Sequence, residues 1–195
     1  MRFWRMITAL AVLAWGLGSG PAGAADEDRA VSGRFLLTDM NGRAVTDEAY
    51  AGKIRLVVFG YTFCPDICPT ILGTLSVALD QLGAERAKVA TLFISVDPER
   101  DTPAHLKEYL SAFPEIIGLT GSPAEVAAAA RNFKVRYEKV ADPGGDPALY
   151  SIDHTAAIYI MDRAGNFLAR MPHAAKPDRV AERVASYLNP KPREE

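Results

Sequence analysis

The chain has two cysteines, Cys64 and Cys68, which lie four positions apart in the stretch GYTFCPDICPT, residues 60–70. Two thiols this close can form a disulfide that staples a loop, exchange electrons with a partner, or bind a metal ion. A disulfide that closes so small a loop removes little chain entropy, which makes the structural staple the weakest interpretation. Redox chemistry and metal binding both stay open.

The prolines of this stretch indicate where the thiols lie. Pro69 suits the first turn of a helix, where a proline loses no hydrogen bond, so we expect Cys68 at the N-cap and Cys64 in the preceding loop. The positive end of the helix dipole should then lower the pKa of both thiols from its usual value of about 8.5 and favour the thiolate. Such a pair would be a good nucleophile and a good metal ligand.

The three-residue spacer PDI sets the motif apart from the C-x-x-C of ordinary thioredoxins. It leaves the sulfurs able to bind a metal as well as to form a disulfide. Two thiolates and one imidazole would be a soft ligand set suited to Cu(I), and one more donor would allow Cu(II). A structural zinc site would need a fourth protein ligand, and a four-cysteine iron–sulfur cluster is excluded.

The elements that must position these residues alternate along the chain. Residues 54–59 and 89–96 are continuous apolar runs, typical of strands covered on both faces. A hairpin is predicted for residues 155–161 and 167–171, around the turn DRAGN. Helices are predicted at residues 69–83, 102–113, 122–133 and 177–188, with Thr102 as an N-cap and with Ser122 and Glu125 as a capping box.

This order of elements predicts an α/β, thioredoxin-like fold: a central mixed sheet flanked by helices, with an N-terminal β-hairpin extension. The right-handed crossover rule makes the first two long strands parallel. The loop with both cysteines and the loop DPERD, residues 97–101, should therefore open at one edge of the sheet. If strand 155–161 runs antiparallel to them, His154 at its start approaches the sulfurs, whereas His105 and His173 should be solvated.

Length and composition predict one domain. The chain has 195 residues, of which 49% are hydrophobic, enough for a single well-buried core. The net charge is −2 and the basic residues are scattered, so a nucleic-acid partner is not expected. We expect the thioredoxin-like domain at residues 33–189, after a polar joint at 26–32 and before a frayed tail at 190–195.

Residues 1–25 have the pattern of a secretory signal peptide. Arg2 and Arg5 precede an apolar run, and Ala22-Gly23-Ala24 resembles a signal peptidase site. An uncleaved membrane anchor is the alternative, although the apolar run is shorter than the roughly 20 residues that span a bilayer. Export to the periplasm, with or without a tether to the inner membrane, would turn the cysteine pair into a disulfide unless something keeps it reduced.

Three segments resemble, in order, the signatures of the Sco/SenC family: GYTFCPDICPT, SVDPERDTP and DHTAAIYIMDRAGNF. Proteins of this family are copper-binding and thioredoxin-like, and they help to assemble the dinuclear copper site of cytochrome c oxidase. The resemblance implies copper ligands at Cys64, Cys68 and His154, and it gives Asp97 a supporting role near them. The alternative for Asp97 is a turn-initiating residue before Pro98.

The resemblance implies an exported metallochaperone that holds one ion of copper, as Cu(I) or Cu(II). Its partner would be the copper-site subunit of cytochrome c oxidase, to which it delivers copper or whose cysteines it prepares, or a periplasmic copper chaperone. The alternative function is that of a thiol–disulfide oxidoreductase that uses Cys64 and Cys68 on exported copper proteins without carrying copper itself.

Overall fold

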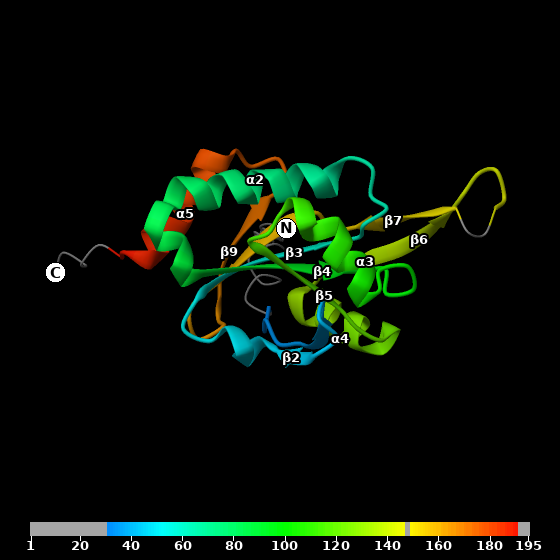
Figure 1. Cartoon of the computed structure of the whole chain (residues 1–195), viewed down its shortest axis with the longest axis horizontal. Coiled ribbons are helices and arrows are strands. Elements are labelled where there is room, and N and C mark those ends of the chain that lie inside the picture. Colours follow the sequence, from blue (N-terminus) through cyan, green and yellow to red (C-terminus); the bar gives the residue numbers. More distant parts are fainter. Residues whose placement is uncertain (1–30, 147–148, 191–195) are drawn as a thin grey trace, which may run out of the picture.

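A computed structural model describes residues 31–146 and 149–190 of the chain. The predicted signal peptide and most of the predicted joint and tail lie outside the described residues. Figure 1 shows a central sheet with α2 and α5 on one face and α4 on the other.

The sheet has seven strands in the order β2-β1-β5-β4-β3-β8-β9. In chain order they are β1 Leu36–Asp39, β2 Ala44–Thr46, β3 Ile54–Gly60, β4 Val89–Ser95, β5 Ile116–Thr120, β8 Ala157–Met161 and β9 Phe167–Pro172. The α-helices are α2 Ile67–Leu82, α3 Pro103–Tyr109, α4 Pro123–Phe133 and α5 Pro177–Leu188. The described residues also include three 3-10 turns: η1 Asp47–Tyr50, η2 Gly83–Lys88 and η3 Leu110–Ala112.

The strand pairing confirms the predicted mixed sheet. Strands β3 and β4 are parallel, in register from Ile54 opposite Val89 to Gly60 opposite Ser95, and β8 runs antiparallel to β3. Every residue of β3, β4 and β8 is buried, because helices or loops cover both faces of the sheet. The predicted N-terminal hairpin is β1–β2, and it extends the sheet through pairing of β1 with β5.

The starts of α3 and α4 follow from capping chemistry. Ser122 and Glu125 form the predicted capping box of α4, and the Thr102 hydroxyl accepts a hydrogen bond from the His105 amide at the start of α3.

The prediction for α2 was wrong by two residues: Asp66 is the N-cap and Cys68 already lies in the helix. The first four N–H groups of a helix have no acceptor within it, so Pro69 fits the third position as well as the first.

A second, two-stranded sheet was not predicted. Strands β6 Tyr137–Ala141 and β7 Tyr150–His154 form a hairpin that projects from one end of the molecule, opposite the C-terminal helix (Figure 1). Most of its residues are exposed, so they lack the apolar runs by which the core strands were recognised. The hairpin ends in His154, which places this histidine on β7 rather than at the start of β8.

The segment Ile67–Lys88, α2 with η2, is the one stretch of the described residues that is long and apolar enough to cross a membrane. Core helices of soluble proteins also meet this criterion. The buried residues of α2 belong to the apolar cluster between the sheet and α5, so α2 is a core helix of this fold.

Candidate metal centre

The fold brings the two cysteines together. Cys64 lies in the loop after β3 and is partly exposed, whereas Cys68 lies in the first turn of α2 and its exposed fraction is 2%. The Cys68 backbone N–H donates a hydrogen bond to Cys64 Sγ over 3.4 Å, and both thiols are free. The helix N-terminus therefore directs a backbone donor at the more accessible sulfur.

The prediction of a lowered pKa is wrong for Cys68. Burial raises the pKa of this thiol, and the neighbouring Cys64 and Asp101 raise it further. Removing the sulfur from water disfavours the thiolate more than the end of the helix favours it. Cys68 is therefore a protonated thiol in the metal-free protein, and it must lose its proton when it binds a metal or attacks a disulfide.

Gly60, the last residue of β3, leaves the space that the Cys68 thiol occupies. A Cβ atom at this position would lie 2.7 Å from Cys68 Sγ and 2.7 Å from Cε2 of Phe93. Side-chain contacts that short do not occur without a shift of the neighbours, so the buried sulfur depends on the absence of a side chain here.

His154 offers one free ring nitrogen. Its Nδ1 lies 3.1 Å from the carbonyl oxygen of Ile152, and a proton on Nδ1 would donate to that oxygen. This tautomer leaves a lone pair on Nε2, which is buried and has no hydrogen-bond partner among the described residues. A backbone acceptor on one imidazole nitrogen and an open lone pair on the other is the usual arrangement of a metal-binding histidine.

The structure does not close the three residues into one ligand set. Among residues 31–146 and 149–190, no three side chains of the types His, Cys, Asp and Glu lie close enough together to hold a metal ion. The imidazole of His154 packs edge-to-face on Tyr61, with 5.8 Å between ring centroids, and Tyr61 precedes Cys64 by three positions. The hairpin and the cysteine loop would have to approach each other for one ion to contact all three.

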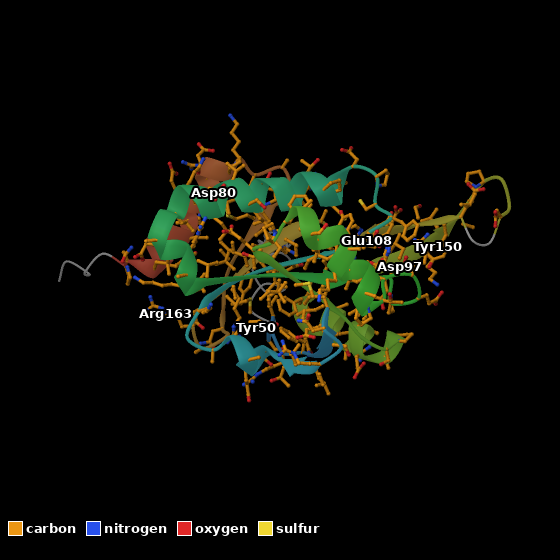
Figure 2. The ribbon with its side chains drawn as sticks, in the orientation of Figure 1. Tyr50, Asp80, Asp97, Glu108, Tyr150 and Arg163 are labelled. Atoms are coloured by element: carbon orange, nitrogen blue, oxygen red, sulfur yellow. The ribbon has the colours of Figure 1, made fainter. Side chains whose placement is uncertain are left out.

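Asp97 anchors the hairpin that carries His154. Its buried carboxylate accepts a hydrogen bond from the Tyr150 hydroxyl over 2.7 Å and another from Nε of Arg100. Its carbonyl oxygen accepts from the amides of Arg100 and Asp101, so it also opens the turn after β4. Both interpretations of Asp97 therefore apply: it shapes the turn, and it supports the candidate site through Tyr150 at the start of β7 (Figure 2).

Arg100 and Lys139 add further contacts at the base of the hairpin. The Arg100 guanidinium donates to the Tyr150 carbonyl over 3.1 Å and stacks 3.6 Å from the Tyr150 ring and 4.5 Å from the Phe63 ring. Lys139 of β6 pairs with Glu99 over 2.6 Å. A two-stranded hairpin is marginally stable alone, so these contacts fix β7 against the body of the protein.

Asp101 is a second buried carboxylate in the loop after β4, and the sequence did not reveal its role there. It is fully buried, and it accepts hydrogen bonds from the Thr62 amide (3.1 Å), the Thr62 hydroxyl (2.6 Å) and the Ser95 hydroxyl (2.6 Å). Burial raises the pKa of this carboxyl group, while the bonds from Ser95 and Thr62 oppose that effect. No pattern in DPERD distinguishes Asp101, which holds the cysteine loop, from Asp97, which holds the hairpin.

The two other histidines are not part of this candidate site. His173 is exposed, as expected. His105 is only half-exposed, because its ring stacks on Phe63 at 5.5 Å between centroids. His105 is therefore partly solvated and partly covered by the Phe63 ring.

The mixed sheet and its helices define a thioredoxin-like domain. A dithiol at a helix start and a histidine with an unpartnered Nε2 lie at one edge of the sheet, and they are candidate ligands for a soft metal. The SCO1/SenC family model matches residues 23–189. The chain belongs to this family.

Individual relatives agree with this assignment. The SCO2-like protein of Rickettsia felis is 37% identical over 153 residues, which cover 78% of this chain and 74% of that protein. The structure of Bradyrhizobium japonicum ScoI with copper bound has a TM-score of 0.74 and 48% identity, and the match covers 81% of this chain and 99% of that one. BsSco, a member of the Sco family of cytochrome c oxidase assembly proteins with a disulfide switch, has a TM-score of 0.64 and 27% identity over 84% of this chain and 96% of its own. These neighbours confirm the predicted fold and family.

Replacing Gly60 should destabilise the protein around Cys68. We expect Gly60→Ala to lower the free energy of unfolding by about 1–3 kcal/mol, because the new methyl group overpacks Cys68 and Phe93. Gly73→Ala is the matched control: it lies within α2, where an added methyl group would meet no neighbouring atom within 4 Å, and it should raise stability by about 1 kcal/mol. Urea denaturation of both variants measures the difference, and equal stabilities would contradict the role assigned to Gly60.

Removing the Tyr150 hydroxyl should loosen the hairpin. Burial, together with the hydrogen bond to Asp97 and the charge of Asp97, raises the pKa of Tyr150 to about 12, so the hydroxyl stays a donor at neutral pH. We expect Tyr150→Phe to cost about 2 kcal/mol of stability, because the buried carboxylate loses a partner. Amide hydrogen exchange in β7 should become faster, whereas Tyr137→Phe on the paired strand should leave it unchanged. Unaltered exchange in Tyr150→Phe would show that Asp97 does not anchor β7.

Proposed function

We propose that this protein is an exported copper chaperone of the Sco type. Reduced Cys64 and Cys68, with His154 from the hairpin, hold one copper ion at the edge of the sheet. They then release it to a partner that offers competing thiolate or imidazole ligands. The copper is cargo, and the protein supplies the ligands and the place of exchange.

The observation that carries this proposal is the buried, unpartnered Nε2 of His154, whose ring packs on Tyr61, three positions before the free thiol of Cys64. A buried polar atom without a partner is costly and calls for an explanation, and a metal ion would provide one. The copper-bound structure of the related ScoI supports copper as that metal. So does the softness of two sulfur ligands and one imidazole.

Thiol redox state controls whether this site can hold copper. Oxidation of Cys64 and Cys68 to a disulfide removes both sulfur ligands, so only the reduced protein is competent. Binding also requires loss of the Cys68 proton, so copper affinity should rise with pH. The three ligands suit Cu(I), and one more donor would allow the site to hold Cu(II).

The location and partners follow from the same proposal. The pattern of residues 1–25 supports export to the periplasm, free or tethered to the inner membrane. The description of BsSco as a member of a family of cytochrome c oxidase assembly proteins supports the copper-site subunit of that oxidase as the recipient. A periplasmic copper chaperone would be the donor or a second recipient.

Loss of His154 should weaken copper binding without unfolding the protein. We expect His154→Ala to raise the copper dissociation constant of the reduced protein at least about tenfold, since even partners outside the ligand set contribute that much. A copper titration followed by thiolate charge-transfer absorbance measures this, with His173→Ala, an exposed histidine, as the matched control. An affinity equal to that of the parent protein would remove His154 from the ligand set.

A second function, thiol–disulfide exchange, is favoured by the unequal burial of the cysteines. The accessible Cys64 thiolate would attack a partner disulfide, form a mixed disulfide and release one partner thiolate. The Cys68 thiol would then lose its proton and attack Cys64 Sγ, which forms the Cys64–Cys68 disulfide and releases the second partner thiolate. The short separation between Cys64 and the start of α2 favours the second step, because the two cysteines already lie together.

The two cysteines should therefore behave differently as single variants. With glutathione disulfide as the probe, Cys68→Ser should accumulate a stable mixed disulfide on Cys64, whereas Cys64→Ser should react at least about tenfold more slowly, because its remaining thiol is buried and protonated. Mass spectrometry of the intact protein follows the adduct. Equal rates for the two variants would refute this order of attack.

A further inference from the structure

Exposed apolar side chains gather beside the cysteine loop. Among the described residues, six large apolar side chains are strongly exposed, and three of them line one groove: Phe63 at 54%, Val140 at 41% and Leu149 at 59%. The groove has a volume of about 610 Å³ and lies between the cysteine loop and the β6–β7 hairpin. Tyr61, Pro65 and Tyr150 are also part of its lining. Apolar surface gathered in this way is typical of a binding surface.

Side-chain contacts hold part of the groove in place. Tyr150 is held by Asp97, and Arg100 fills the space between the Tyr150 and Phe63 rings. Phe63 is further supported by the His105 ring on α3. These side chains are already ordered, so they lose little conformational freedom when the groove binds a partner.

The rim of the groove carries a negative charge at Asp142. This residue also lines an adjoining hollow of about 430 Å³ together with Glu99 and Lys139. The two cations of these surfaces are each paired with a carboxylate, Arg100 with Asp97 and Lys139 with Glu99. An occupant with positive charge therefore complements this edge.

We propose that this groove docks a polypeptide segment of the protein that exchanges copper or electrons with Cys64, a segment with apolar side chains flanked by lysine or arginine. The proposal rests on the proposed function for the identity of that protein. Phe63 and Pro65 flank Cys64 in the chain, so a segment seated on them brings the partner's ligands or disulfide next to the accessible sulfur. The apolar groove supplies affinity, and the carboxylates select the basic partner.

Binding of short peptides to the reduced, metal-free protein tests the groove directly. The probe is a synthetic peptide with two leucines flanked by lysines, and in matched peptides glutamates replace the lysines or serines replace the leucines. None contains cysteine or histidine, so binding does not depend on copper or on thiol exchange. A failed copper titration would refute the proposed function and leave the peptide-binding result intact. Failure of the peptides to bind would refute the docking groove and leave the proposed function intact.

We expect the leucine–lysine peptide to shift the backbone NMR signals of Phe63, Val140 and Leu149. The glutamate and serine peptides should bind to the parent protein at least about tenfold more weakly than the leucine–lysine peptide. The leucine–lysine peptide should also bind to Leu149→Ser at least about tenfold more weakly than to the parent protein, because an apolar contact is lost. Val77→Ser is the matched control, because Val77 is 46% exposed on α2 and lies outside the groove.

Several results would overturn the proposal. Equal binding of the glutamate or serine peptide would refute the proposed apolar and basic character of the occupant. NMR signals that shift elsewhere in the protein, or no binding at all, would refute the groove as the docking site. Self-association in sedimentation that Leu149→Ser abolishes would assign the groove to a second copy of the chain. Binding of zwitterionic lipid vesicles that Leu149→Ser abolishes would assign it to a membrane surface.

Discussion

The candidate site depends on one buried carboxylate, that of Asp101. The parallel register brings Gly60 and Ser95 level at the ends of β3 and β4, but pairing stops there and each strand continues into a loop. Asp101 joins the two loops through Thr62 and Ser95. Burying a carboxylate carries a large desolvation cost, which only close hydrogen bonds can offset. The cysteine loop is therefore held in place by a group that tolerates few other arrangements.

The loop DPERD contacts both parts of the candidate site, the cysteine loop through its last residue and the β6–β7 hairpin through its first. Its last residue, Asp101, fixes the turn that leads to Cys64, and its first, Asp97, fixes the hairpin that leads to His154. Arg100 lies between them and stacks on rings from both halves, Phe63 of the cysteine loop and Tyr150 of the hairpin. One short segment after β4 therefore sets the positions of the two cysteine sulfurs and of the imidazole.

The sequence predicted those parts of the fold that repeat a periodic pattern. Strands β3 and β4 were recognisable because both of their faces are buried, and the start of α4 because Ser122 and Glu125 cap each other. The edge of the sheet where Cys64, Cys68 and His154 lie followed from strand direction alone. Three features had no such signal: the exposed strands β6 and β7, the depth of Cys68 in its helix, and the choice between two aspartates of one loop. Each depends on tertiary contacts, and periodicity reports only on burial along one element.

The unequal construction of the site suits the transfer of a bound ion. The two sulfurs are already adjacent in the metal-free protein, whereas His154 lies on a separate hairpin and packs against Tyr61. In the proposed site, part of the binding free energy of copper is spent on bringing the imidazole to the sulfurs, so copper is held less tightly than by a ligand set formed in advance. In that proposed site, the last ligand to join would also be the one whose departure opens the ion to a partner. A carrier needs this balance, because a fully preformed site would bind its cargo too firmly to give it up.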